Sequence, residues 1–282
     1  MAARAGAARA LPHARRRPRG HAGLSAPRFE RYVALGDSST EGLADGDARR
    51  GYRGWSRRLA ERLAAAQGGL LYANLGERGL TTREIRERQL APALALRPDL
   101  ATLFSGTNDV LALRFDLEAF TADMQAMQRA LRAGGATVLT FTLPELSPLL
   151  PLARLVAPRI RAMNERLRAV CAGTGARLVD FAAHPVATDA RLWNDDRIHA
   201  NPAGHARIAD ALAESLGLPD AGGGWREPLP AVPPPGALGT AVREARWTLR
   251  HLLPWCVLGM VRAIRRPAPR QPARGELRQV SP

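Results

Sequence analysis

Five apolar runs of strand length recur along the chain, and segments with helical spacing separate them. The apolar runs are residues 32–35, 70–73, 100–104, 137–141 and 177–180. The helical segments cover roughly residues 54–67, 82–96, 117–132, 152–172 and 202–216. Nearly continuous apolar strands that alternate with helices are typical of a parallel sheet covered on both faces. We therefore predict an α/β fold, a three-layer α/β/α sandwich around a flavodoxin-like, doubly wound parallel sheet of about five strands.

The expected helices carry readable start and stop signals. Thr81 and Glu84 have the spacing of a capping box, and Asp116 is a good N-cap for the helix that follows it. Asn201 stands directly before a proline, which suits the first position of a helix, and Gly217 suits the far end of that helix. These signals support the order of elements and predict where the last helix begins and ends.

Composition divides the chain into four parts. Residues 1–28 are rich in Ala, Arg, Pro and Gly, and we predict a disordered, Arg-rich tail because they offer little apolar surface to offset the entropy of ordering. Residues 29–218 hold the alternating strands and helices of one domain. Residues 219–237 are rich in Pro and Gly and predict a linker. Residues 238–282 form an Arg-rich C-terminal segment with a short amphipathic helix.

The formal net charge of +15 lies almost entirely at the two ends. Residues 1–28 contribute +7 and residues 226–282 another +7, so residues 29–225 are nearly neutral. The chain has no Lys, which indicates a compositional bias toward Arg. Clustered Arg attracts phosphate-bearing surfaces, but no nucleic-acid module accompanies the clusters, and we expect no nucleic-acid partner.

The C-terminal segment and the N-terminus bear on localisation. The apolar run 252–261 has about half of the roughly twenty residues that span a bilayer. With its flanking Arg and Trp, the segment 238–266 is compatible with weak contact to a membrane surface, and packing against the domain or a second subunit is the open alternative. No apolar signal-peptide run is present at the N-terminus, which predicts a cytoplasmic or peripheral membrane protein.

The cysteines add little chemistry. Cys171 and Cys256 lack the spacing of metal ligands, and two cysteines do not suggest a disulfide scaffold. We expect no metal and no cofactor.

Three short polar motifs follow the apolar runs or precede a helix. They are Gly36–Ser38, Gly106–Asp109 and Asp196–His199. Because the carboxyl ends of parallel strands meet at one edge of the sheet, residues far apart in the sequence can meet there. Together the motifs offer a nucleophile, a base with an orienting carboxylate, and donors for an oxyanion, which are the groups that serine-based acyl transfer requires.

Ser38 is the candidate nucleophile and His199 the candidate base. The carboxylate of Asp196, three residues before His199, is positioned to orient the imidazole and fix its tautomer, whereas Asp195 has the poorer register. Taken alone, a Ser after a strand is a common helix cap, and an Asp three residues before a His is a common surface turn. His205 lies within the last helix, and we predict it to be a surface or boundary residue.

The remaining motif supplies hydrogen-bond donors. The side-chain amide of Asn108 is an uncharged donor for an oxyanion, and the backbone amides of Ser38 and Gly79 are further candidates. The alternative for residues 106–109 is an ordinary turn, with Asp109 capping the next segment.

These residues resemble the SGNH or GDSL hydrolase superfamily, whose four blocks supply Ser, Gly, Asn and His in this order. The blocks match Ser38, Gly79, Asn108 and His199, and the resemblance covers about residues 30–217. It implies a three-layer α/β/α fold and ester hydrolysis without metal or cofactor. It also implies that Ser38, Gly79 and Asn108 are the oxyanion donors. Ser39 stands where the name-giving pattern has Leu, a position that takes no part in the chemistry.

The predicted function is a serine hydrolase that cleaves carboxylic esters, of short acyl chains or acetylated sugars, through an acyl-enzyme on Ser38. Alternatives on the same site are an acyltransferase or a lysophospholipase-type lipase, and a further one is a non-catalytic binding module that retains the fold. The expected partner is a small-molecule, carbohydrate or lipid ester. Four residues are candidates for lining the mouth of the site: Tyr52, Trp55, Arg114 and Phe115.

Overall fold

A six-stranded sheet forms the centre of the molecule in the computed structural model, which describes residues 28–47, 49, 51–219, 221–233, 236–252 and 275–282. The strand order is β7-β6-β5-β1-β4-β8, and all neighbours are parallel except β4 and β8. The strands are β1 (Arg31–Gly36), β4 (Leu70–Asn74), β5 (Leu100–Phe104), β6 (Thr137–Phe141), β7 (Arg177–Val179) and β8 (Arg278–Val280). The five predicted strands are confirmed, in the flavodoxin-like order.

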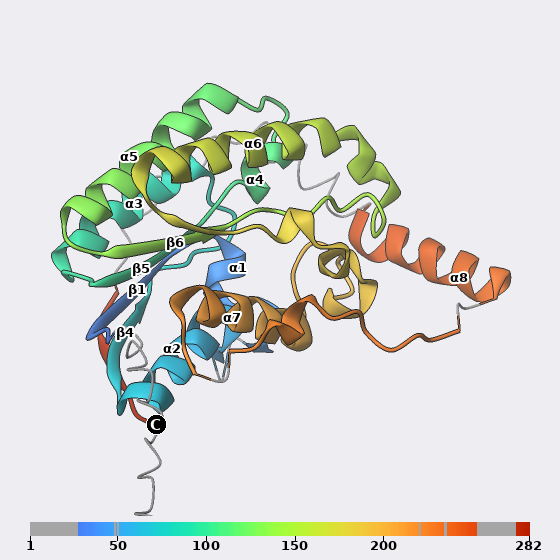
Figure 1. Ribbon diagram of the computed structural model, residues 1–282. Helices are drawn as coiled ribbons and strands as arrows, with labels where there is room; N and C mark the ends of the chain where they lie inside the picture. The colour runs from blue at the N-terminus through green and yellow to red at the C-terminus, as the bar shows by residue number, and fades with distance from the viewer. Residues whose placement is uncertain (1–27, 48, 50, 220, 234–235, 253–274) are drawn as a thin grey trace, which may run out of the picture.

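Helices cover both faces of this sheet, so the three-layer prediction is confirmed (Figure 1). One face carries α2 (Gly54–Gln67) and α7 (Pro202–Leu216). The other face carries α3 (Thr82–Ala95), α5 (Leu117–Ala133) and α6 (Ala157–Thr174).

Shorter elements lie between the main ones. They are the helices α1 (Ser38–Glu41) and α4 (Thr107–Leu111), the hairpin of β2 (Gly46–Asp47) and β3 (Gly51–Tyr52), and the 3₁₀ turns η1 (Pro151–Leu155), η2 (Phe181–Ala183), η3 (Pro185–Thr188), η4 (Ala190–Leu192) and η5 (Gly223–Arg226). The helix α8 (Ala237–Trp247) runs into a short π-helix, η6 (Thr248–Leu252).

The central strands form because their side chains are buried on both faces. All five residues of β5 are buried, as are residues 32–36 of β1. Val33 in the middle of β1 pairs with Ala73 of β4 on one side and Ala101 of β5 on the other. Burying one such Leu or Val side chain contributes roughly 1.5–3 kcal/mol. The apolar run is therefore both the cause of the strand and the core of the sandwich.

The helix signals act as predicted. Thr81 and Glu84 form the capping box of α3, and the Asp116 side chain accepts from the backbone of α5. The Asn201 side chain accepts the amides of Ala203 and Gly204 at the start of α7. Gly217 ends α7 with a φ of 73°, a conformation that favours glycine. Because this cap fixes where α7 begins, it also fixes the position of the residues just before the helix.

Two elements beyond residue 218 add buried residues to the core of the domain. Val280 of β8 is buried and pairs with Leu70 at the edge of the sheet, an antiparallel sixth strand that the sequence pattern did not indicate. Trp225, within the segment predicted as a linker, is buried and stands edge-on to the rings of Phe181 and His184. A single Trp and a three-residue strand carry no periodicity, so neither was visible in the sequence.

Candidate active site

The three motifs meet at the carboxyl-terminal edge of the sheet. Ser38 begins α1 directly after β1, and Asn108 lies in α4 directly after β5. The strands β1 and β5 are neighbours, and the chain leaves β1 for β4 on the opposite side. This reversal is the switch point at which doubly wound sheets bind ligands. His199 reaches the same place from the loop that leads into α7, because its ring contacts Ser38.

Ser38, His199 and Asp196 form a continuous hydrogen-bonded chain. The Ser38 Oγ lies 2.8 Å from His199 Nε2, and His199 Nδ1 lies 2.8 Å from Asp196 Oδ2. With the Nδ1 proton donated to the carboxylate, Nε2 is free to accept the proton of the serine hydroxyl. The arrangement is that of a serine nucleophile, its base and an orienting carboxylate.

The carboxylate of Asp196 is held in its charged form. Its Oδ1 accepts the backbone amides of Ile198 at 2.9 Å and His199 at 3.0 Å. Burial acts to raise the pKa of Asp196, but the hydrogen bond and charge of His199 together with these two amides outweigh it and lower the pKa to about 2. The side chain therefore stays ionised near neutral pH and can stabilise a protonated His199. Asp195, the competing carboxylate, is exposed.

A buried glutamine that sequence reasoning missed fixes the strand end before Ser38. The Gln89 side chain of α3 accepts the amide of Gly36 and donates to its carbonyl, both at 2.8 Å. A Cβ at position 36 would lie 2.5 Å from the Phe104 carbonyl oxygen, so only glycine fits this close approach. Ser38 thus follows a backbone segment that is held from both sides.

Asp37, which precedes the serine, is a buried carboxylate whose pKa is shifted in the opposite direction to that of Asp196. Its Oδ1 accepts the amide of Ser39 at 2.9 Å, which caps α1. Burial raises the pKa of Asp37 to about 6, more than the Ser39 amide and the His199 charge lower it. Its Oδ2 lies 3.4 Å from the side-chain amide of Asn108.

The predicted oxyanion donors border one another. Asn108 Nδ2 donates to the carbonyl of Leu80 at 3.0 Å, so Asn108 lies beside the turn that contains Gly79, and its contact to Asp37 places it beside Ser38. Gly79 has a φ of 79°, in the region that favours glycine. Among the described residues, no acceptor takes the backbone amides of Ser38 and Gly79.

Asp109 does not cap the next segment, as the turn alternative supposed, because the N-cap of the helix that follows, α5, is Asp116. Its carboxylate accepts the amide and the hydroxyl of Thr82 at the start of α3. Burial raises the pKa of Asp109 despite these hydrogen bonds. The contact joins α4, which carries Asn108, to the helix that follows the Gly79 turn.

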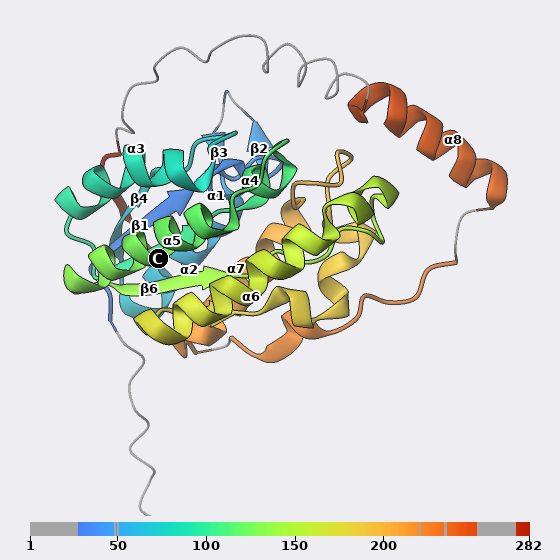
Figure 2. The same ribbon diagram turned by 90° about the horizontal axis from the view of Figure 1, so that it is seen from above.

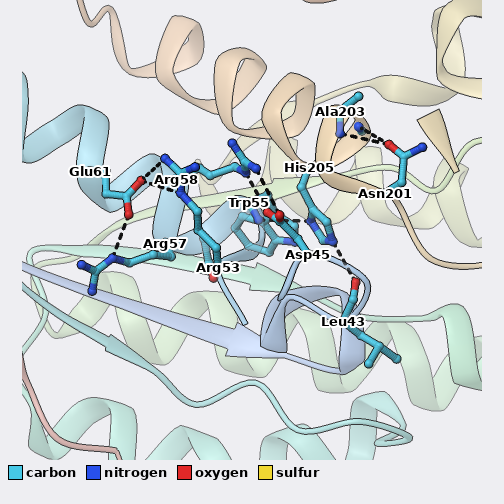
Figure 3. Close-up of polar contacts among 12 residues, drawn as sticks. Leu43, Asp45, Arg53, Trp55, Arg57, Arg58, Glu61, Asn201, Ala203 and His205 are labelled. Carbon is cyan, nitrogen blue, oxygen red and sulfur yellow. Dashed lines mark hydrogen bonds and ion pairs between the residues drawn. The ribbon is translucent and has the colours of Figure 1, made fainter. Parts of the chain in front are cut away.

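The expectation for His205 is wrong, because this residue is fully buried. Its Nδ1 accepts the amide of Trp55 at 3.1 Å, and its Nε2 donates to the carbonyl of Leu43 at 3.0 Å. Figure 3 shows the ring of His205 reaching from α7 to these two partners, beside the Asp45–Arg58 ion pair. Burial lowers the pKa of His205, which favours the neutral ring that this pattern needs.

His205 therefore ties two parts of the site together. The segment 43–55 follows Ser38, and α7 follows His199. A contact that pins one to the other helps to keep the serine oxygen within hydrogen-bonding distance of the imidazole. Nothing in the spacing of the sequence distinguishes this histidine from a surface residue.

The four residues predicted to line the mouth of the site differ in their exposure. Trp55 is fully buried and stands edge-on to Phe141, so it does not line the mouth. Tyr52 is half-buried beneath the guanidinium of Arg78, 5.4 Å from its ring centre, next to the Gly79 turn. Arg114 is exposed, and Phe115 packs toward Phe120.

The described residues can also be considered as metal ligands and as membrane spans. In this part of the chain no three His, Cys, Asp or Glu side chains are grouped so that they could bind a metal ion. None of the helices described is both long and apolar enough to cross a membrane. The apolar run 252–261 lies almost entirely outside the described residues, as does the tail 1–27, so the predicted membrane contact stays a prediction.

Comparison with known proteins finds similarity over the central part of the chain. A family model described as "GDSL-like Lipase/Acylhydrolase family" matches residues 34–207. None of the curated proteins matches in sequence.

Three solved structures with the same fold are each less than 25% identical to the chain. An α/β hydrolase enzyme, LAE5, from the metagenome of Lake Arreo is 24% identical with a TM-score of 0.57, over 69% of this chain and 98% of its own. A lipase/acylhydrolase from Enterococcus faecalis is 22% identical with a TM-score of 0.56, over 72% and 100%. A catalytic mutant of Axe2, an acetylxylan esterase from Geobacillus stearothermophilus, is 19% identical with a TM-score of 0.57, over 72% and 99%. At these identities the likeness shows the fold.

Proposed function

This chain belongs to the GDSL-like lipase/acylhydrolase family and is a carboxylic ester hydrolase, and on that premise we propose that it cleaves short-chain acyl esters through an acyl-enzyme on Ser38. The observation that carries the proposal is the hydrogen-bonded chain from the Ser38 hydroxyl through His199 to Asp196. Both contacts have the length of a hydrogen bond, and along the first of them the serine proton can pass from the hydroxyl to the imidazole.

The first half of the reaction forms the acyl-enzyme. His199 Nε2 takes the Ser38 proton while Oγ attacks the ester carbonyl carbon, giving a tetrahedral intermediate. Asp196 stabilises the imidazolium that results. When the intermediate collapses, the bond from carbon to the alkoxy oxygen breaks, and the His199 proton goes to that oxygen. The alcohol leaves, and the acyl group remains bonded to Ser38.

The second half repeats these steps with water as the nucleophile. His199 takes a proton from water, the hydroxide attacks the acyl carbon, and the returning proton restores the Ser38 hydroxyl as the carboxylic acid leaves. In both halves the negative oxygen is bound by the amides of Ser38 and Gly79 and by the Asn108 side chain. For this role Asn108 turns the N–H that now points to Asp37, a contact of 3.4 Å, toward the substrate oxygen.

A small apolar hollow supports the assignment to short acyl chains. It has a volume of about 70 Å³, and among its lining residues are Thr107 and Ile198, the chain neighbours of Asn108 and His199. Aromatic side chains of Phe104 and Phe141 form part of its wall. A space of this size admits a few carbon atoms. Relative kcat/KM for p-nitrophenyl esters is expected to be highest for acetate to butyrate and to fall for octanoate and longer chains.

Acetylated sugars are the natural esters of this kind, and we include them in the proposal. Acetylated xylo-oligosaccharides tested beside p-nitrophenyl acetate distinguish a sugar esterase from a general one. Preference for dodecanoate or longer esters, or for lysophospholipids, would favour the lipase alternative.

The nucleophile is tested by covalent labelling. A fluorophosphonate probe is expected to label the wild type at Ser38 and to leave Ser38→Ala unlabelled. Ser39→Ala is the matched control, because Ser39 is the adjacent hydroxyl and its side chain accepts from Trp55 Nε1, whereas Ser38 is the hydroxyl next to His199 Nε2. Absence of labelling in the wild type at neutral pH would favour the non-catalytic binding module.

A further inference from the structure

The helix α8 lies apart from the sheet and reaches the domain beside the turn that carries Asp196 and His199. Figure 2 shows α8 at the edge of the molecule, outside the three layers. The family match ends at residue 207, so α8 lies beyond the matched part of the chain. The three solved structures named above are covered almost completely by at most 72% of this chain. The helix thus lies outside the domain that the family model matches.

One side chain, Arg197, makes the contact between that turn and α8. Its Nη1 and Nη2 donate to the two carboxylate oxygens of Glu244, at 2.7 and 2.8 Å. Its guanidinium also lies over the ring of Trp247, 4.8 Å from the ring centre, and Nη1 donates to the carbonyl of Leu149 at 3.1 Å. A hollow of about 530 Å³ lies beside these contacts, and residues of α8 and of the loop line it together.

The backbone of Arg197 is in an unfavourable conformation. Its φ is 61°, in the left-handed region, where a residue with a Cβ is disfavoured relative to glycine. Asp196 precedes it, and the amides of Ile198 and His199 that follow both donate to the Asp196 carboxylate. The orientation of the Asp196–His199 pair therefore depends on Arg197 keeping this conformation.

The charge of Arg197 adds a second constraint. A guanidinium next in sequence to Asp196 is a competitor of His199 for that carboxylate. The Nη1 and Nη2 groups of Arg197 both donate to Glu244, and the Arg197 side chain is only 15% exposed. A bidentate pair of this kind is more directional than a single ion pair. The pairing keeps the guanidinium away from Asp196.

We propose that Arg197 is a positioning residue, anchored by Glu244 and Trp247 of α8, that holds the Asp196–His199 turn in its working geometry. The C-terminal helix then belongs to the esterase machinery although it lies outside the family domain. The expected effect on kcat rests on the proposed function, whereas the expected effect on the Asp196–His199 turn rests on the geometry alone.

The first test breaks the anchor at its far end. Glu244→Ala is expected to lower kcat on p-nitrophenyl acetate about tenfold with KM within about twofold, because a small misplacement of the base costs up to roughly 10² in rate. The matched control is Glu118→Ala, which breaks another Arg–Glu pair with a 2.7 Å contact, to Arg166, between α5 and α6. Equal kcat values for the two variants would overturn the proposal.

The second test separates backbone positioning from loss of a side chain. Arg197→Ala and Arg197→Gly remove the same contacts, but only glycine takes the left-handed conformation freely. Arg197→Ala is expected to lose about tenfold in kcat and Arg197→Gly to stay within about threefold of the wild type. Adding Glu244→Ala to Arg197→Gly is expected to change nothing further. Equal losses in the Ala and Gly variants, or an additive effect of Glu244→Ala, would contradict positioning.

A spectroscopic measurement tests the positioning role of Arg197 without relying on ester hydrolysis. The His199 Nδ1 proton, hydrogen-bonded to Asp196, gives a low-field proton signal. We expect this signal in the wild type, Glu118→Ala and Arg197→Gly, and we expect it to be lost or broadened in Glu244→Ala. A wild type that keeps this signal but neither hydrolyses esters nor reacts with the probe would refute the proposed function alone. An unchanged signal in Glu244→Ala, with the fold intact by thermal melting, would refute the role of α8 alone.

Discussion

Two carboxylates belong to the candidate site, one beside Ser38 in the chain and one beyond His199, and their surroundings shift their pKa values in opposite directions. Asp196 lies in a loop, accepts two backbone amides and pairs with His199, and its pKa is lowered to about 2. Asp37 lies one residue before Ser38, is buried, and its pKa is raised to about 6 mainly by desolvation. The comparison shows that the surroundings favour the charged form of Asp196 and disfavour the charged form of Asp37.

This difference matches the two tasks of an acyl-transfer site. In the proposed mechanism, an imidazolium forms on His199 and needs a fixed negative charge at its far nitrogen, which Asp196 would supply. The oxyanion of the same mechanism would form near Asn108, where it needs donors and is opposed by any nearby negative charge. A carboxyl group beside Asn108 with a raised pKa carries its charge less readily than an ordinary aspartate. Substitutions on each side of the serine test this division.

The largest effect is expected on the charged side. Asp196→Asn keeps the size of the side chain but removes the charge and favours the wrong imidazole tautomer, so kcat is expected to fall about 10⁴-fold, as in other triad enzymes. The measurement is the steady-state hydrolysis of p-nitrophenyl acetate. Asp195→Asn is the matched control, since this neighbouring carboxylate is exposed, and its kcat is expected to stay within about twofold of the wild type. A comparable loss in Asp195→Asn would move the orienting role to that residue.

A smaller loss is expected on the donor side. Asn108→Ala removes one of three oxyanion donors and is expected to lower kcat about 10²–10³-fold with little change in KM. The Ser38–His199–Asp196 chain does not contain Asn108, so the His199 Nδ1 proton signal is expected to persist. Loss of that signal would mean that Asn108 supports the fold of the site rather than the intermediate.

The candidate residues that the sequence revealed share one property, which is that their positions follow from local signals. Ser38 and Asn108 each follow a strand with an unmistakable apolar run, and His199 precedes a helix with a strong Asn201 cap. Parallel strands in this order bring such positions to one edge whatever their separation in sequence. The site could therefore be assembled from the pattern without knowledge of side-chain contacts.

The residues that sequence reasoning missed depend on packing between elements. Gln89 and His205 are buried polar side chains whose partners lie 53 and 150 residues away. In the helix pattern each occupies a position that suits a surface residue equally well. The Arg197–Glu244 contact joins positions 47 residues apart, and nothing local marks it. Buried polar contacts of this kind follow from tertiary packing, which periodicity does not encode.

The smallest predicted effect concerns stability and sharpens the comparison of the two carboxylates. Because the pKa of Asp37 is raised from 3.8 to about 6 in the folded state, the folded protein binds the proton more tightly than the unfolded chain between these pH values. Stability is therefore lost as pH rises from about 4 to 6, by about 3 kcal/mol in total for this group. Asp37→Asn removes this loss, so the variant is expected to gain stability relative to the wild type across that interval.

Asp196 provides the control with the opposite sign. Its lowered pKa contributes stability that is fully present above 3.8 and lost only as pH falls toward 2, so Asp196→Asn is expected to leave the slope between pH 4 and 6 unchanged. Urea unfolding at pH 4, 5, 6 and 7 measures both slopes. Equal slopes for the wild type and Asp37→Asn would show that the Asp37 carboxyl is ionised across this range. The site would then carry negative charge on both sides of Ser38, and the contrast between them would rest on hydrogen bonding alone.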